Sequence, residues 1–153
     1  MGLISFFLGK KPTIIEDSFF GRMHLMEHRK DASLSYFECY RHFEPLDGPI
    51  EICLYGNIGP TQKQIAFFKK IENQYNTIED AVATAITKEM RNWDPDFRII
   101  NFRNEFKPSF LVIPHCNEEP MSWEISFFST SDPHHVFNAR LRNFELEGID
   151  MDG

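Results

Sequence analysis

The sequence predicts an α+β fold, in which a mostly antiparallel sheet of about seven strands carries two helices on one face. Three observations support this prediction. Segments with a hydrophobic period of two occupy the first and last thirds of the chain, and segments with a helical period lie between them. The resulting order, three strands, two helices and about four strands, is typical of α+β folds rather than of alternating α/β folds.

The chain has the length and composition of one globular domain. It contains 153 residues, of which 42% are hydrophobic and 25% are charged, and 16 of them are Phe. A chain of about 150 residues can bury a sizeable core, and this ordinary composition argues against wholesale disorder. We expect a single α+β domain over residues 18–153, preceded by a lead segment over residues 1–17.

The lead segment begins with a short apolar run from Leu3 to Leu8, which Lys10 and Lys11 follow. The run is shorter than the roughly 20 residues of a membrane-spanning helix, and a signal peptide would carry its lysines before the run. Its composition fits a short amphipathic helix that packs on the domain or touches a membrane surface. The three cysteines form no Cys-x-x-Cys unit, so we expect reduced thiols in a soluble, cytoplasmic protein.

The first third of the chain predicts three strands, because apolar and polar residues alternate there with a period of two. In the first of these segments, Met23 and Leu25 occupy alternate positions among polar residues. Between the second and third segments, Pro45 and the Asp47-Gly48 pair supply turn chemistry, so these two strands should form a hairpin. The three expected strands span residues 18–28, 34–43 and 50–55.

The middle of the chain predicts two helices. Thr61 begins the first with a pattern that resembles a capping box, and Thr77 begins the second, with two acids in its first turn where the helix dipole favours them. Apolar residues recur at helical spacing in both segments. Because only residues 74–77 remain as a connection, we expect two antiparallel helices or one kinked helix, ending at Asp94-Pro95.

The last third of the chain predicts about four further strands. Between Met121 and Phe127, apolar residues alternate strictly with polar ones, which is the clearest strand pattern in the chain. A continuous apolar run lies just before Pro114, and two more alternating segments follow. The expected strands span residues 110–113, 121–127, 135–142 and 146–151.

Candidate catalytic residues cluster in one turn-like segment. Ser129, Asp132 and His135 are the residue types of a nucleophilic triad, but they lie close together in sequence and no Gly-x-Ser-x-Gly elbow accompanies them. A metal site made of Asp132, His134 and His115 would require two loops to meet. We therefore assign no catalytic residue, and an enzyme of unknown class that uses this turn with His115 is the alternative hypothesis.

The sequence argues against a metal site formed by His24 and His28. On a strand, four residues separate the two imidazoles by roughly 13 Å, whereas a zinc ligand must lie about 2 Å from the ion. Because the surrounding segment alternates with a period of two, we expect solvent-facing strand histidines. The sequence predicts neither a metal site nor a cofactor.

Negative charge is concentrated in the last third of the chain. Residues 1–107 hold 15 acids and 14 bases (net −1), whereas residues 108–153 hold 8 acids and 2 bases (net −6), which together make the net charge of −7. Such an asymmetry favours encounter with a basic partner, and a broad nucleic-acid groove would need a basic footprint. An equally supported hypothesis is that these acids only keep the protein soluble. We expect the partner-binding residues to be Glu118, Glu119, Glu124, Asp132, Glu145 and Glu147.

Several motifs, in this order, resemble a family of small bacterial proteins. The resemblance extends over residues 18–153, and Cys39 stands where that family has Gly. The opening hairpin and the closing strands contribute most of the matching positions. The matching motifs are Phe20-Gly21, Tyr36-Phe37-Glu38, Phe43-Glu44-Pro45, Ile50-Glu51, Gly59-Pro60-Thr61, Gln64, Phe67-Phe68, Tyr75, Trp123 to Phe127, His135 with Phe137, and Glu147 to Gly153.

This resemblance implies a function in binding rather than catalysis. Proteins of the family are often encoded beside bacterial toxins and are read as immunity proteins of contact-dependent inhibition or polymorphic toxin systems. The chain is then expected to bind and neutralise a cognate toxin C-terminal domain, with a basic nuclease as the expected class. Neither direct nucleic-acid binding nor stable membrane insertion is expected. The acidic last third fits a partner that must be basic to hold nucleic acid.

Overall fold

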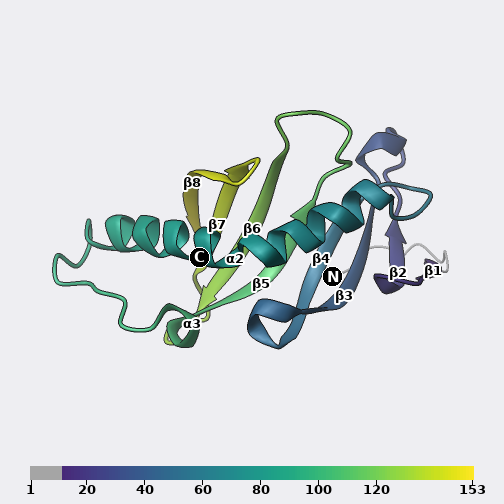
Figure 1. Ribbon diagram of the computed structural model, residues 1–153. Helices are drawn as coiled ribbons and strands as arrows, with labels where there is room; N and C mark the ends of the chain where they lie inside the picture. Colours follow the sequence, from purple (N-terminus) through teal and green to yellow (C-terminus); the bar gives the residue numbers. More distant parts are fainter. Residues whose placement is uncertain (1–11) are drawn as a thin grey trace.

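The computed structural model describes residues 12–153 and contains one eight-stranded sheet, whose strands lie side by side in sequence order (Figure 1). The strands are β1 (Thr13–Asp17), β2 (Gly21–Met26), β3 (Tyr36–Phe43), β4 (Gly48–Tyr55), β5 (Phe106–Ile113), β6 (Ser122–Ser129), β7 (Val136–Arg142) and β8 (Glu145–Asp152). The helices are α2 (Gln62–Met90) and the short α3 (Phe102–Glu105), with 3-10 turns η1 (Ala32–Leu34) and η2 (Glu44–Leu46). The helix expected around Leu3 to Leu8 lies outside the described residues.

The α+β class is confirmed, but the sheet is mixed. Six neighbouring strand pairs are antiparallel, and β4 and β5 are parallel. Helix α2 connects this pair, and a crossover connection of this length can return the chain to the starting end of the sheet. The sequence pattern located the helical segment correctly, but the parallel pair that the crossover makes was not anticipated.

The sheet has eight strands rather than about seven because it extends into the segment set apart as a lead. Strand β1 pairs with β2 from Thr13 opposite Leu25 to Asp17 opposite Gly21. Gly21 has a φ of 75°, a conformation that glycine adopts without strain, at the turn that closes this hairpin. The boundary expected at residue 18 therefore falls inside a β-hairpin.

The hairpin expected between the second and third strands is present as β3 and β4. The two strands pair along their full length, from Tyr36 opposite Tyr55 to Phe43 opposite Gly48. The turn between them is η2, and Asp47 closes it in the left-handed conformation, with a φ of 48°. The Pro-and-Asp-Gly pattern predicted this connection for the correct physical reason.

The expectation of two separate helices was wrong, and the alternative of one helix through this segment is the one observed. Helix α2 runs without interruption for 29 residues, and Thr77 lies in its interior rather than at a start. Residues 74–77 contain neither Gly nor Pro, so nothing there ends a helix. The buried stripe also passes through this segment in phase, from Ile71 through Tyr75 to Ile78. The helix ends at Met90, before Asp94-Pro95.

The capping box at the start of α2 is confirmed, and it joins the helix to the sheet. The Thr61 side chain accepts a hydrogen bond from the backbone N–H of Gln64, whose side chain accepts one from Thr61 in return. The Gln64 amide also donates to the carbonyl oxygens of Tyr55, at 2.7 Å, and Pro114, at 2.9 Å. This buried side chain therefore satisfies carbonyl groups where β4 and β5 end.

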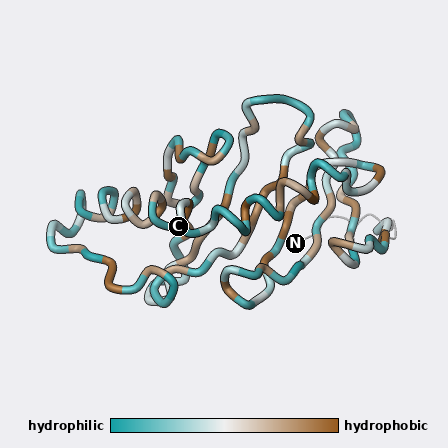
Figure 2. Tube along the Cα trace, in the orientation of Figure 1, coloured by the Kyte–Doolittle hydropathy of each residue, from teal (hydrophilic) through white to brown (hydrophobic). Residues whose placement is uncertain are grey.

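The core lies between α2 and one face of the sheet, and Figure 2 shows hydrophobic residues alternating with hydrophilic ones along the chain. Aromatic edge-to-face pairs lock the two layers together, as between Phe43 and Tyr75, whose ring centroids are 5.1 Å apart. Helix α3 lies on the same side, because Arg103 forms an ion pair with Glu79 of α2 at 2.8 Å. Fully buried members include Met23, Phe37, Ile52, Leu54, Phe68, Ile71, Ile78, Val82, Ile86, Leu111, Ile113, Ile125 and Phe127.

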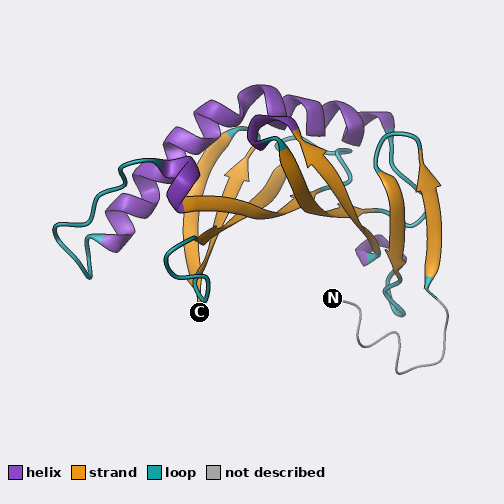
Figure 3. Ribbon diagram, turned by 90° about the horizontal axis from the view of Figure 1, so that it is seen from below, coloured by secondary structure: helices purple, strands orange, loops and turns teal. Residues whose placement is uncertain are grey.

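The opposite face of the sheet is covered by no α-helix of residues 12–153 (Figure 3). Successive strand residues point to opposite faces, so the side chains that alternate with the core residues lie there. We call this surface the open face. Within the described residues, no helix is both long and apolar enough to cross a membrane.

Candidate functional site

The centre of the open face carries tyrosines beside carboxylates. Tyr36 on β3 lies opposite Tyr55 on β4, and their ring centroids are 6.2 Å apart. Tyr40, which is 66% exposed, lies opposite Glu51. The charge of Glu51 and a hydrogen bond to it raise the pKa of Tyr40. Tyrosine combines a large apolar ring with a polar tip, and it is enriched in the buried centres of protein interfaces.

The C-terminal half of the open face carries a group of carboxylates around Glu124. This residue lies opposite Arg140 of β7, and the next strand, β8, places Asp150 and Asp152 nearby. Burial and the charge of Asp150 raise the pKa of Glu124, and Asp152 adds to that effect while Arg140 opposes it. The acids of β6 and β8, on either side of β7, therefore repel one another in the folded protein.

The two arginines of this region are already paired. Nε of Arg140 lies 2.9 Å from Oδ2 of Asp150, and Nε of Arg142 lies 2.6 Å from Oε1 of Glu147. Each of these pairs is about half exposed, so each is expected to contribute less than about 1 kcal/mol to stability. Because both cations are engaged, the charges of the remaining acids are available to a partner.

The six acids expected to bind a partner occupy three separate places. Glu124, Glu145 and Glu147 lie on strands β6 and β8. Glu118 and Glu119 lie in the loop between β5 and β6, where they line a hollow together with Lys63 and Lys70 of α2. Asp132 lies in the loop between β6 and β7. The structure therefore brings the three strand acids to one region of the sheet, and it separates them from the two acids of the β5–β6 loop and from Asp132.

Other open-face residues were missed because only the last third of the chain was considered. Tyr36, Tyr40 and Glu51 belong to the polar phase of strands that the sequence predicted correctly. A group of tyrosines in the outward phase of two adjacent strands is a detectable signal, because contiguous exposed apolar surface, unlike a single exposed ring, marks an interaction site. Reading the strand phases across the whole chain would have found them.

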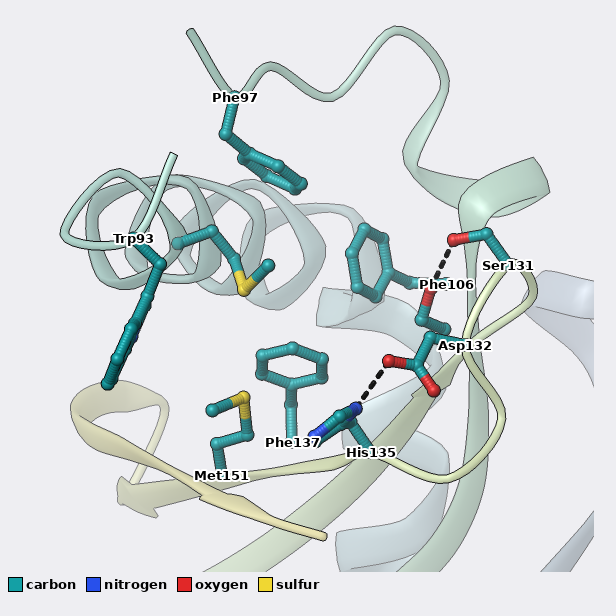
Figure 4. Close-up of a pocket in the computed structure, with 10 residues that line it drawn as sticks. Trp93, Phe97, Phe106, Ser131, Asp132, His135, Phe137 and Met151 are labelled. Atoms are coloured by element: carbon teal, nitrogen blue, oxygen red, sulfur yellow. Dashed lines mark hydrogen bonds and ion pairs between the residues drawn. The ribbon is translucent and has the colours of Figure 1, made fainter. Parts of the chain in front are cut away.

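A cavity of about 400 Å³ lies on the other side of the sheet, between the end of α2 and the ends of strands β5, β6, β7 and β8. Figure 4 shows Trp93 and Met151 on one side, Ser131 and Asp132 on the opposite side, and the ring of Phe137 between them. Its size is within the range of small-molecule sites. The lining residues are Met90, Trp93, Phe97, Phe106, Ser129, Ser131, Asp132, His135, Phe137 and Met151.

The polar side of this cavity consists of two hydrogen-bonded pairs. Nδ1 of His135 lies 2.5 Å from Oδ2 of Asp132, and the two hydroxyl oxygens of Ser129 and Ser131 are 3.0 Å apart. The hydrogen bond from His135 lowers the pKa of Asp132. The backbone of Gly153 packs on the His135 ring, because a Cβ at that position would lie 2.4 Å from Cδ2 of the imidazole.

These contacts do not assemble a nucleophilic triad. Among the described residues, neither serine forms a hydrogen bond with His135, and the two serines bond to each other instead. His134 is exposed and contributes only its backbone N–H, 3.4 Å from Asp132. His115 follows the far end of β5, about 25 Å along the strand from this cavity, and its Nε2 lies 3.0 Å from the Ser33 carbonyl oxygen.

Metal ligation and thiol chemistry find no support in these positions. Between Pro12 and Gly153, no group of three or more His, Cys, Asp or Glu side chains is arranged to hold a metal ion. His24 lies on β2, whereas His28 lies beyond it and accepts a hydrogen bond from the Asp31 backbone. Burial raises the pKa of Cys39 and of Cys53 to about 12, so both thiols stay protonated at neutral pH.

Comparisons of the chain with protein-family models, with curated proteins and with solved structures gave no match. A functional assignment therefore depends on the chemistry of two places, the open face and the cavity beside Asp132. The open face is a broad surface with charge and aromatic side chains, as protein partners require. The cavity is enclosed by apolar walls and suits a small ligand.

Proposed function

We propose that this chain is a cytoplasmic immunity protein, which binds and neutralises the C-terminal domain of a bacterial toxin through its open face. One observation carries the proposal: no α-helix of residues 12–153 covers the open face, which presents exposed Tyr40 beside carboxylates of both halves of the sheet. The order of the sequence motifs supports the same class of function. Occlusion of the toxin's site by this surface would be the mechanism of neutralisation.

The dimensions of the open face match those of a protein interface. Eight strands spaced about 4.8 Å apart form a sheet about 34 Å wide, and strands of eight residues are about 26 Å long. The product, roughly 900 Å², is close to the roughly 800 Å² that each partner contributes to a stable complex. A partner can therefore cover the exposed tyrosines completely, and full desolvation is what makes such residues important for affinity.

The charge of the open face selects the partner. Glu51, Glu124 and Asp152 are acids of this face that take part in no ion pair within residues 12–153. A cationic partner would relieve the repulsion that raises the pKa of Glu124. A nuclease domain must be basic to hold its nucleic-acid substrate, so a nuclease toxin is the class of partner that we propose.

The test uses the product of the gene immediately upstream, which the proposal expects to carry a toxin domain. Purified immunity protein should bind that domain, and cells that produce both should survive. The association rate should fall about tenfold or more from low to high salt, because charge steers the encounter. An association rate that is independent of salt would contradict the electrostatic part of the proposal.

Variants locate the surface. Tyr40→Ala should weaken the complex at least about tenfold, the effect of truncating an interface hot spot, and Glu124→Gln should slow association. Glu89→Gln, on the exposed side of α2, is the matched control for removal of one carboxylate and should bind normally. Unimpaired binding by both open-face variants would place the interface elsewhere and refute the proposal.

The contact between His135 and Asp132 favours a second candidate function, an enzyme of unknown class. If protection of cells depended on catalysis, Asp132→Asn would abolish protection and leave toxin binding intact. The immunity proposal expects this variant to protect as well as the native protein does. Survival assays and binding measurements on the same variant therefore separate the two candidates.

A further inference from the structure

We propose that the cavity beside Asp132 is a binding site for a small organic cation, an amine carried on an apolar or aromatic body. The cavity lies on the α2 side of the sheet, so a ligand there would leave the open face free. The inference is therefore independent of the proposed immunity function. It rests on the walls of the cavity, on its single carboxylate and on the position of its mouth.

The walls supply the apolar part of the site. Phe97, Phe106, Phe137 and Trp93 present aromatic rings, and the thioethers of two methionines complete the lining. Aromatic faces attract cations as well as apolar groups, and methionine adapts its shape to different ligands. These walls therefore suit a ligand that has both an apolar body and a positive charge.

The charge of the lining determines the sign of the ligand. Asp132 is the acid of this lining, and neither Lys nor Arg is among the lining residues. The imidazole of His135 holds the carboxylate through its Nδ1, which fixes the direction of Asp132 while leaving its charge in place. An anionic ligand would face this carboxylate without a compensating cation, whereas an ammonium group would be attracted by it.

Two hydroxyl groups complete the polar end of the site. Ser129 and Ser131 are hydrogen-bonded to each other at 3.0 Å, a bond that uses one proton and one lone pair. Their remaining lone pairs can accept hydrogen bonds from an ammonium N–H. The Asp132 carboxylate and the Ser131 hydroxyl, which come from one short loop, thus lie on the same side of the cavity, opposite Trp93 (Figure 4).

The mouth of the cavity is open to solvent. The side chains of Trp93 and Met151 are 76% and 39% exposed, although both line the cavity. A ligand can therefore enter without unfolding of the core. Trp93 also offers a local signal, because Trp123 is buried at the opposite end of β6, about 20 Å along the strand from the Ser129 end.

The test titrates the full-length protein with three probes that share one skeleton: phenylpropylamine, phenylpropanol and phenylpropionate. Fluorescence of Trp93 should change in a saturable manner with the amine, and the amine should bind at least about tenfold more tightly than the acid, as expected for a charge-assisted hydrogen bond. Amide chemical shifts should change around the cavity. Equal affinity for the three probes, or no saturable change, would refute the inference.

Two carboxylate variants provide the second arm of the experiment. Asp132→Asn should reduce the affinity for the amine about tenfold, to that of the alcohol, while Asp96→Asn, an exposed acid outside the lining, should have no effect. Trp93→Phe should remove the fluorescence signal but keep the chemical-shift changes. Unchanged amine affinity in Asp132→Asn would overturn the proposed role of the carboxylate. If that variant does not fold, the comparison of amine with acid in the native protein still decides.

Discussion

At the scale of one residue, the negative charge of Glu124 should lower the stability of the free protein while it favours binding of a basic partner. Its raised pKa means that the folded protein binds this proton more tightly than the unfolded chain does. The contribution of Glu124 to stability therefore falls as the pH rises from the unfolded pKa through the folded one. Such a carboxylate destabilises the free protein at neutral pH, which is common where a side chain serves binding.

We predict that Glu124→Gln melts about 2 °C higher than the native protein at neutral pH, because the amide carries no charge to be buried. The effect is small because the site is half-buried and 1 kcal/mol corresponds to about 2–4 °C in a domain of this size. The difference should vanish below about pH 4, where the native carboxyl group is protonated. Thermal melting against pH measures it.

Asp80→Asn is the matched control for this prediction, because Asp80 is exposed in the middle of α2, away from the open face and from both ends of the helix. It should melt with the native protein at every pH. A Glu124→Gln variant that melts lower than the native protein at neutral pH would show that the charge is favourable in the folded state. The acids of β6 and β8 would then be stabilising groups, and the electrostatic reason for a basic partner would be lost.

At the scale of elements, Thr77 distinguishes one continuous helix from two. If Thr77 were an N-cap, its substitution by Ala would lower the free energy of unfolding by about 1 kcal/mol. Because Thr77 is instead an exposed residue inside α2, the same substitution should raise the free energy of unfolding by up to about 0.7 kcal/mol, since Ala has the highest helix propensity. We therefore predict that Thr77→Ala is slightly stabilising in urea denaturation.

Thr61→Ala is the control for the same substitution at the true N-cap, where a loss of about 1 kcal/mol is expected. The two Thr→Ala variants should thus differ in sign. Losses of similar size in both would mean that α2 is divided near Thr77 in solution. If both variants share the m-value of the native protein, the shift of each urea midpoint gives the change in the free energy of unfolding.

The elements were predictable where local chemistry determines them. The turn at Pro45 and the Asp47-Gly48 pair produced the expected β3–β4 hairpin. The division of α2 was wrong because Thr77 has the residue type of a cap, and only the packing of Tyr75 and its neighbours against the sheet makes it an interior position. Capping residues are permitted inside helices when tertiary contacts on the other side stabilise the helix.

The candidate site was predictable only in part, for a reason of geometry. Charge along the sequence identified Glu124 and Glu147, but loop residues such as Glu119 and Asp132 have no strand phase that assigns them to a face. The cavity was not predictable, because its walls come from α2, four strands and two loops. Only the fold brings Trp93 and Met151 to one mouth.

At the scale of the whole molecule, the crossover by α2 places the most protected strands in the middle of the sheet. β4 and β5 each have two neighbours, are joined in parallel, and lie under α2, where Ile52 and Leu111 are fully buried. β1 is an edge strand of five residues with one neighbour, and its Ile14 is 40% exposed. Both edges leave backbone groups without partners in the sheet.

We predict that native-state hydrogen exchange follows this order. Amides of Ile52 and Leu111 should exchange only through global unfolding, whereas those of β1 should exchange through local opening at a much lower free energy, because few contacts must break there. Exchange measured against low concentrations of urea separates the two cases, since global opening depends strongly on urea. Amides of β1 that exchange as slowly as Leu111 would show that the strand folds cooperatively with the sheet. β1 would then belong to the domain in its energetics as well as in its geometry.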